Sequence, residues 1–332
     1  MWTACRASVP NKPLSMYSIH PEIDFPEADH ILKALRLNRT PGWSFPAYHL
    51  GLGFHAVSAQ QAVLGMDVTR NLDAQGRPLG VALAVFADLS LAAGVRGRVA
   101  DDVRLATVSA SLSFTGVAAK GPLRAASTCH FLAPDGAMTI ANTAVSLTSG
   151  DTILCTGTAN FAVLDNRMGT APHPRPGVHD VDTLQPLPLN ELTASEEALL
   201  ARARRASHAS RSGGGAAFLD HFWGLIPDLK EHGPECVSPC GMHVGNRVGH
   251  TQGGILLGLA MNTSAAAPGP GWRVLDVSAN FHSPGQGKHL HAVARLLRTG
   301  RSLAQVMCEI RTDDGTLVLS ALSTLVREGS PD

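Results

Sequence analysis

The chain has 332 residues, of which 44% are apolar and only 16% are charged, and its 27 Lys and Arg balance its 27 Asp and Glu. This length and composition provide enough core for about two domains, and the chain is too apolar and too weakly charged to be disordered. The zero net charge excludes the basic surface that nucleic-acid binding or a polybasic membrane patch requires.

No segment of the sequence has the pattern of a secretory signal or a membrane span. Residues 1–20 lack an apolar run of the length typical of a signal peptide, and the run at 81–87 is far too short to cross a bilayer. We therefore expect a cytoplasmic protein. Cys236 and Cys240 have the spacing of a pair of zinc ligands, but the chain offers no second compact ligand pair, and no metal is expected.

The first half is expected to contain one buried helix followed by strands. Residues 80–94 are apolar nearly all round, which predicts a buried helix, although Asp88 lies within it. The strands expected after this helix are 108–114, a segment beginning at Gly121, and a hairpin formed by 142–147 and 152–161.

A linker separates the two halves. Residues 166–190 contain five prolines and show no periodicity. A helix is expected to follow, capped by Thr193 or Ser195, and to end before the glycines at 213–215. The resulting division is a first domain at 22–165, a linker with one helix at 166–215, and a second domain at 216–328.

The second half is expected to repeat the order of the first. A glycine turn leads into an apolar helix at 253–266, and strands follow at 275–281, from Gly287, at 304–310 and at 317–326. One buried helix wrapped by an antiparallel sheet, present twice, is an α+β design.

The two glycine turns carry matching motifs. The second half contains Asn246-Arg-Val-Gly249-His-Thr-Gln252-Gly253-Gly254, and the first half contains Leu79-Gly80 followed nine residues after Leu79 by Asp88. These residues resemble the motif of hotdog-fold thioesterases of the phenylacetyl-CoA-thioesterase-like branch, in which Asn-x-x-Gly-x-x-His-Gly-Gly precedes the central helix and an acid lies nine positions after the His. Gln252 stands in place of that His.

The resemblance covers about residues 55–165 and 236–327 and implies a tandem chain. The expected fold is a double hotdog, with two antiparallel sheets that each wrap a central buried helix. In the family, two hotdog units pair, and each site takes its Asn, its His or Gln and its glycine from one unit and its acid from the other.

Each half of this chain lacks one part of that set. The first half has Asp73 and Leu79 at the Asn and His positions, and the second half has Met261 at the position of the acid. One composite site would therefore remain, formed by Asp88 of the first half with Asn246, Gln252, Gly253 and Gly254 of the second. The mirror position, where Leu79 and Gly80 would face Met261, is expected to be inactive.

The resemblance implies hydrolysis of an acyl-CoA thioester to a free acid and coenzyme A (CoA), which is part of the substrate, so that no cofactor is expected. Asp88 would act as general base or nucleophile, and the backbone N–H of Gly253 or Gly254 would bind the oxyanion. Gln252 and Asn246 would orient water or the thioester carbonyl, and Thr107 would supply a hydroxyl at the start of its strand.

Each of these residues also has a structural interpretation, and these interpretations stay open at this point. The two glycines would allow tight packing of the helix, Asp88 would reach solvent or cap a loop, Asn246 and Gln252 would bond within their loop, and Thr107 would be an ordinary β-branched strand residue. Lys288, Arg295 and Arg298 are interpreted as exposed strand cations rather than as ligands for the phosphates of CoA.

Two other functions are considered. A non-catalytic acyl-CoA binding protein is suggested by the degenerate first half. A hotdog enoyl thioester hydratase or dehydratase would have a His five residues after the acid, where this chain has Ala93. The acyl group is not specified by the sequence, although the aromatic-rich segments 25–55 and 218–239 are expected to cover its pocket. The chain is expected to be a monomer, as a pseudo-dimer of its halves, or a homo-oligomer.

Overall fold

The computed structural model describes residues 24–40, 42–100, 102–135, 138–164, 183–212 and 215–329. Its helices are α1 (Ala28–Asn38), α2 (Phe45–His49), α3 (Gly80–Arg96), the 3-10 turn η2 (Leu189–Glu191), α4 (Ala194–Arg211), α5 (Phe218–Trp223) and α6 (Gly253–Ala266). Its strands are β1 (Gly53–Val57), β2 (Ala62–Met66), β3 (Arg104–Phe114), β4 (Leu123–Asp135), β5 (Met138–Ser149), β6 (Thr152–Leu164), β7 (Asp228–Lys230), β8 (Gly233–Pro239), β9 (Trp272–Phe281), β10 (His289–Thr299), β11 (Leu303–Thr312) and β12 (Leu317–Arg327).

The named strands form one antiparallel sheet in the order β1-β2-β4-β5-β6-β3-β9-β12-β11-β10-β8-β7. The strands of the two halves meet where β3 pairs with β9, with Ser111 opposite Ser278. The expectation of two separate sheets is therefore wrong. An unpaired edge strand leaves a row of N–H and C=O groups without partners. Here the edge strands β3 and β9 of the two halves pair with each other, so that their backbone groups form hydrogen bonds.

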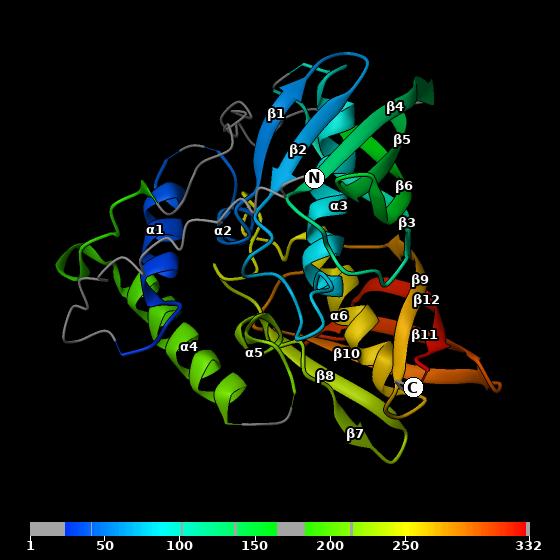
Figure 1. Cartoon of the computed structure of the whole chain (residues 1–332). Helices are drawn as coiled ribbons and strands as arrows, with labels where there is room; N and C mark the ends of the chain where they lie inside the picture. Colours follow the sequence, from blue (N-terminus) through cyan, green and yellow to red (C-terminus); the bar gives the residue numbers. More distant parts are fainter. Residues whose placement is uncertain are drawn as a thin grey trace, which may run out of the picture.

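The two apolar helices pack against this sheet and against each other, as Figure 1 shows for α3 and α6. Helix α3 contacts strands β1 to β6, and helix α6 contacts strands β8 to β12. Both helices were predicted, and α3 ends at Arg96, two residues later than expected. Their all-round apolar composition is explained because each helix is covered by strands and by the other helix.

Two glycines of α6 allow it to approach α3 closely. A Cβ atom on Gly254 would lie 2.4 Å from the Cα of Val85, and one on Gly258 would lie 2.2 Å from Cγ2 of Val81. Real Cβ atoms do not come so close to other heavy atoms. The crossing therefore depends on glycines in α6 that face valines in α3.

The turns that lead into the two helices have the same construction. A side-chain oxygen accepts hydrogen bonds from the backbone N–H groups two and four residues later, and it belongs to Asp73 before α3 and to Asn246 before α6. Gly76 and Gly249 then turn the chain with φ of 72° and 82°, values that favour glycine. Both turns thus deliver the chain to a helix start in the same way.

The remaining helices form a lobe beside the sheet, in which α1 and α4 lie side by side (Figure 1). Helix α4 is capped by Thr193, one of the two caps expected, in a capping box in which Thr193 and Glu196 satisfy each other's backbone N–H groups. Arg39 of the α1 end bonds both carboxylate oxygens of Glu196, at 2.9 and 2.7 Å. This ion pair ties the predicted linker helix to the first half.

Aromatic side chains fill the space between this lobe and the second half. The Phe222 ring lies 6.0 Å from that of Phe45, 5.2 Å from that of Phe218 and 5.4 Å from that of His49. Phe45, Phe222 and Trp223 are fully buried. Several of the aromatic residues expected to cover an acyl pocket therefore pack as core between elements of both halves.

Among the described residues, no helix is both long enough and apolar enough to cross a membrane.

Candidate active site

Asp88 lies in the third turn of α3 with only 6% of its surface exposed. Its Oδ2 accepts a hydrogen bond of 2.6 Å from Nε2 of Gln252, which lies at the start of α6. Its Oδ1 lies 3.4 Å from the donating hydroxyl of Thr107 on β3, and the backbone N–H of Gly254 also donates toward the carboxylate. The structure therefore brings together Asp88, Thr107, Gln252 and Gly254, and it excludes the interpretation that Asp88 reaches solvent.

Burial dominates the ionisation of this carboxyl group. Loss of hydration raises the pKa of Asp88 from 3.8 to about 6, although the hydrogen bonds from Gly254, Thr107 and Gln252 each lower it. A buried carboxyl group with a raised pKa and donors from both halves of the chain is typical of a functional site. Near neutral pH this group is predominantly a carboxylate.

Gln252 is held at both ends of its amide. Its Oε1 accepts a 3.0 Å hydrogen bond from the N–H of Ile255 and thereby caps α6, while its Nε2 donates to Asp88. Its own backbone N–H donates to the carbonyl of Val244 at 2.9 Å. Because the carbonyl end is committed to the helix, the NH₂ end must face the carboxylate.

The first N–H groups of α6 can be followed one by one. A helix leaves its first N–H groups without partners inside the helix. Here the N–H of Ile255 is capped by Gln252, and that of Gly254 faces Asp88. The N–H of Gly253 has no hydrogen-bond partner in the described part of the chain. Gly253 is also partly exposed, whereas Gly254 is buried.

The two glycines have different surroundings. A Cβ atom on Gly253 would lie 3.0 Å from each carboxylate oxygen of Asp88, whereas one on Gly254 would collide with the α3 backbone. The absence of a side chain at Gly253 therefore keeps the space beside the carboxylate open. The structural interpretation, tight helix packing, applies to Gly254.

Asn246 is not placed against the carboxylate. Its Oδ1 accepts 3.0 Å hydrogen bonds from the backbone N–H groups of Val248 and His250, and no hydrogen bond joins it to Asp88 among the described residues. Asp73 makes the equivalent bonds in the first half. Asn246 therefore shapes the turn that presents Gln252, which is the loop interpretation of this residue.

The mirror position contains no ionisable group. A Cβ atom on Gly80 would lie 3.2 Å from Cε of Met261, so that Gly80 faces Met261 as Gly253 faces Asp88. Leu79 is the N-cap of α3 and makes no side-chain hydrogen bond to the helix, and Met261 is 3% exposed. An apolar contact thus occupies the place that corresponds to the Asp88 site.

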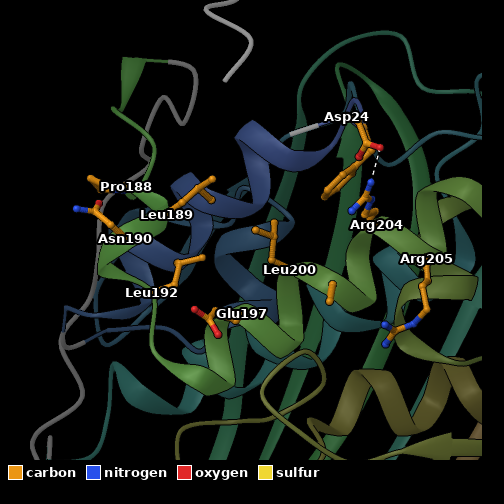
Figure 2. A pocket seen from close by; sticks show the side chains of 11 residues that line it. Asp24, Pro188, Leu189, Asn190, Leu192, Glu197, Leu200, Arg204 and Arg205 are labelled. Atoms are coloured by element: carbon orange, nitrogen blue, oxygen red, sulfur yellow. Dashed lines mark hydrogen bonds and ion pairs between the residues drawn. The ribbon is translucent and has the colours of Figure 1, made fainter. Parts of the chain in front are cut away.

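A large cavity lies elsewhere, in the helical lobe. This cavity has a volume of about 760 Å³. Its lining includes Leu189, Leu192 and Leu200 and the ion pair of Asp24 with Arg204, all labelled in Figure 2. Asp88 and Gln252 do not line it. In the part of the chain that the structure describes, no group of three His, Cys, Asp or Glu side chains is arranged to hold a metal ion.

Part of the second half also matches a known protein family. Residues 244–326, which include Gln252, Gly253 and the strands after α6, match the family model for the N-terminal domain of acyl-CoA thioesterases. This part of the second half is therefore similar to an acyl-CoA thioesterase domain. The resemblance noted in the sequence and the enzyme class it implied, a thioester hydrolase, are thereby confirmed. No curated protein sequence matches this chain.

Solved structures resemble most of this chain. A protein from Lactobacillus plantarum, described as an oleoyl thioesterase, is 10% identical with a TM-score of 0.50, over 89% of this chain and 100% of its own. A hot dog fold protein from Alicyclobacillus acidocaldarius is 11% identical with a TM-score of 0.48, over 84% of this chain and 96% of its own. A tesB protein from Mycobacterium avium subs paratuberculosis is 14% identical with a TM-score of 0.47, over 83% and 96%.

Proposed function

We propose that this chain hydrolyses an acyl-CoA thioester to a free acid and CoA at one composite site between two hotdog halves. The observation that carries the proposal is the 2.6 Å hydrogen bond between Gln252 and Asp88, two residues 164 positions apart that come from different halves. The mirror position, with Gly80 and Met261, has no acid and no amide.

The double-hotdog interpretation is supported by equivalent irregularities in the two halves. Val108 is skipped where β3 pairs with β6, and Leu275 is skipped where β9 pairs with β12. Ser111 and Ser278 lie opposite each other at the junction, and their hydroxyl oxygens are 2.9 Å apart. A pseudo-twofold axis between these two serines relates the halves.

The proposed mechanism begins with ionised Asp88. As a base, its carboxylate takes a proton from a water molecule as the hydroxide oxygen adds to the thioester carbonyl carbon. The negative charge that develops on the carbonyl oxygen is stabilised by the free N–H of Gly253 at the positive end of α6. The C–S bond then breaks, the carbonyl re-forms, and the proton passes to the departing thiolate of CoA.

A nucleophilic route uses the same groups in a different order. The Asp88 carboxylate adds to the carbonyl carbon, the C–S bond breaks to give an anhydride, and water then hydrolyses the anhydride to regenerate Asp88. Single-turnover hydrolysis in ¹⁸O-labelled water tests the anhydride route. Label in the Asp88 side chain shows that water has added to the aspartyl carbonyl of an anhydride, whereas general-base hydrolysis, or water addition to the acyl carbonyl of an anhydride, labels the product acid alone.

The function is tested by measuring thiol release from short, long, branched and aryl acyl-CoAs. We expect turnover by the wild type and a loss of about 10³-fold in Asp88→Asn, as general-base or nucleophilic groups usually give. Asp220→Asn is the matched control, since Asp220 is a partly buried acid whose pKa is also raised by loss of hydration, but it accepts a hydrogen bond from Asn262 rather than from a site residue.

Two results would overturn the proposal. Full activity in Asp88→Asn would exclude the composite site. Absence of thiol release from every substrate, combined with thermal stabilisation by acyl-CoA, would indicate a non-catalytic binding protein instead.

A further inference from the structure

A hollow of about 310 Å³ lies at the hairpin between β10 and β11, outside the Asp88 site. Its polar lining comes from Arg298, Arg301, Ser302, Gln305 and Thr324. Arg298, Gln305 and Thr324 form a row across three neighbouring strands, because Arg298 is the register partner of Gln305 and Gln305 is the register partner of Thr324.

The two arginines of this hollow are not neutralised. Arg298 and Arg301 make no ion pair and no side-chain hydrogen bond within the described residues, whereas Arg39, Arg77 and Arg311 each pair with a carboxylate. Residues 277–308 contain no Asp or Glu. The closest acid in the row is Asp276, the register partner of Thr324, which lies three strands away from Arg298, roughly 14 Å at the usual strand spacing.

The equivalent hairpin of the first half lacks this charge. The pairing of β4 with β5 and that of β10 with β11 have the same irregularity, and it places Phe131 at the position of Arg298. Residues 125–149 contain no Lys or Arg. The cationic hollow is therefore a property of the second half alone and not of the sheet architecture.

We propose that this hollow binds the phosphate groups of a nucleotide. Guanidinium groups pair with phosphate oxygens through parallel N–H bonds, and the hydroxyls of Ser302 and Thr324 and the amide of Gln305 add neutral donors. A nucleotide phosphate can come from the CoA portion of the substrate or from a separate free nucleotide. The first source rests on the proposed function, and the second does not.

Direct binding tests the shared chemistry. Adenosine 3′,5′-bisphosphate, with adenosine as the uncharged comparison, is titrated calorimetrically into wild type, Arg298→Gln/Arg301→Gln and Arg295→Gln. Arg295 is exposed on the same strand but does not line the hollow. We expect binding of the bisphosphate to weaken by about tenfold or more in the double variant and by less than about threefold in Arg295→Gln.

Kinetics identify the source of the phosphate. If the hollow holds the CoA portion, the double variant raises KM for acyl-CoA and leaves kcat, and KM for the phosphate-free acyl-pantetheine, unchanged. If it holds a separate nucleotide, bisphosphate binding is lost while both KM values stay the same. Either result supports the proposal.

The proposal is overturned if the wild type does not bind the bisphosphate, or if the double variant binds it as tightly as wild type does. The titration is repeated with Asp88→Asn. Bisphosphate binding retained in that variant would show that the hollow binds nucleotide phosphate whether or not the Asp88 site hydrolyses a thioester.

Discussion

The carboxylate of Asp88 lies among apolar residues of α3. It accepts hydrogen bonds from Gln252 at the start of α6 and from Thr107 on β3. Burial raises its pKa to about 6, and the amide of Gln252 keeps a short hydrogen bond to it. Gln252 does not titrate, so Asp88 is the one group of this hydrogen-bonded pair whose ionisation can change with pH. This differs from the motif of the related thioesterases, in which a His at the same position adds a second titrating group.

The pH dependence follows from this single group. Because the carboxylate is the reactive form in either proposed route, kcat/KM should rise tenfold per pH unit below about 6 and reach a plateau above it. A pH–rate profile of the wild type from pH 4.5 to 8 measures this. A profile that falls as pH rises through 6 would contradict the assignment, since it would require a protonated Asp88.

Stability should change with pH in the opposite direction. The pKa of Asp88 is about 6 in the folded chain and near 3.8 when exposed, so the folded state binds the proton more tightly. Its contribution is therefore lost as pH rises from about 4 to about 6, by on the order of 3 kcal/mol. Relative to wild type, Asp88→Asn should gain free energy of unfolding over that window, measured by urea denaturation. A constant difference would show that the pKa is not raised.

Gly253 should tolerate no side chain beside the carboxylate. Gly253→Ala would place Cβ 3.0 Å from both oxygens of Asp88, so we expect kcat to fall by about 10²-fold with little change in Tm. Gly80→Ala is the matched control, because its Cβ would contact only Met261. Equal activity in Gly253→Ala and Gly80→Ala would contradict the assignment of Gly253 to the proposed site.

The site residues were predictable from sequence to the extent that a motif marked them. Asp88, Gln252 and Thr107 come together as expected. The position of Asn246 was not predictable, because the same side chain can orient a ligand or close a turn, and only the contacts with Val248 and His250 decide between these roles. No spacing in the sequence indicated that Gly253 and Gly254 would differ in their surroundings.

At the scale of elements, the crossing of α3 and α6 depends on Gly258. Gly258→Ala would bring Cβ to 2.2 Å from Cγ2 of Val81, and overpacking of this kind costs about 1–3 kcal/mol of unfolding free energy. Val81→Ala in the same chain should recover part of that loss, as chemical denaturation of all four forms of the cycle would show. Gly121→Ala, where nothing lies within 4 Å, should change stability by less than about 0.5 kcal/mol.

Strictly additive effects of Gly258→Ala and Val81→Ala would mean that this contact does not set the distance between the helices.

The two central helices and the strands after them were predictable because their residues are apolar over long, uninterrupted runs. The union of the strands into one sheet was not. The edge residues of β3 include Ser109, Ser111 and Ser113, whose alternation with apolar residues fits any half-exposed strand. Partner choice at an edge depends on which other edge is presented to it, and periodicity within a strand does not contain that information.

At the scale of the whole molecule, the mirror position has the same turn geometry as the Asp88 site but contains Leu79 and Met261 in place of the amide and the acid. The turn at Asp73 matches the turn at Asn246, and Gly80 faces Met261. At the mirror position Leu79 and Met261 stand in place of Gln252 and Asp88, and Val274 stands in place of Thr107.

Restoring the amide and the acid of the proposed site should create a second site at the mirror position. In the Asp88→Asn background, Leu79→Gln with Met261→Asp should return measurable acyl-CoA hydrolysis. Met261→Asp alone should instead be destabilising by several kcal/mol, because it buries an unpaired carboxyl group. A triple variant that folds, by circular dichroism, yet releases no thiol would show that the mirror position lacks more than these two groups.

The β3–β9 junction also has a consequence during synthesis. The residues of β9 follow those of β3 by more than 150 positions, so the ribosome completes the first half before β3 can obtain its partner. Until then β3 is an open edge strand, able to pair with the same edge of a neighbouring nascent chain. Since Ser111 and Ser278 are equivalent residues that meet at this edge, the natural competitor of correct assembly is a β3–β3 pairing between two molecules on one polysome.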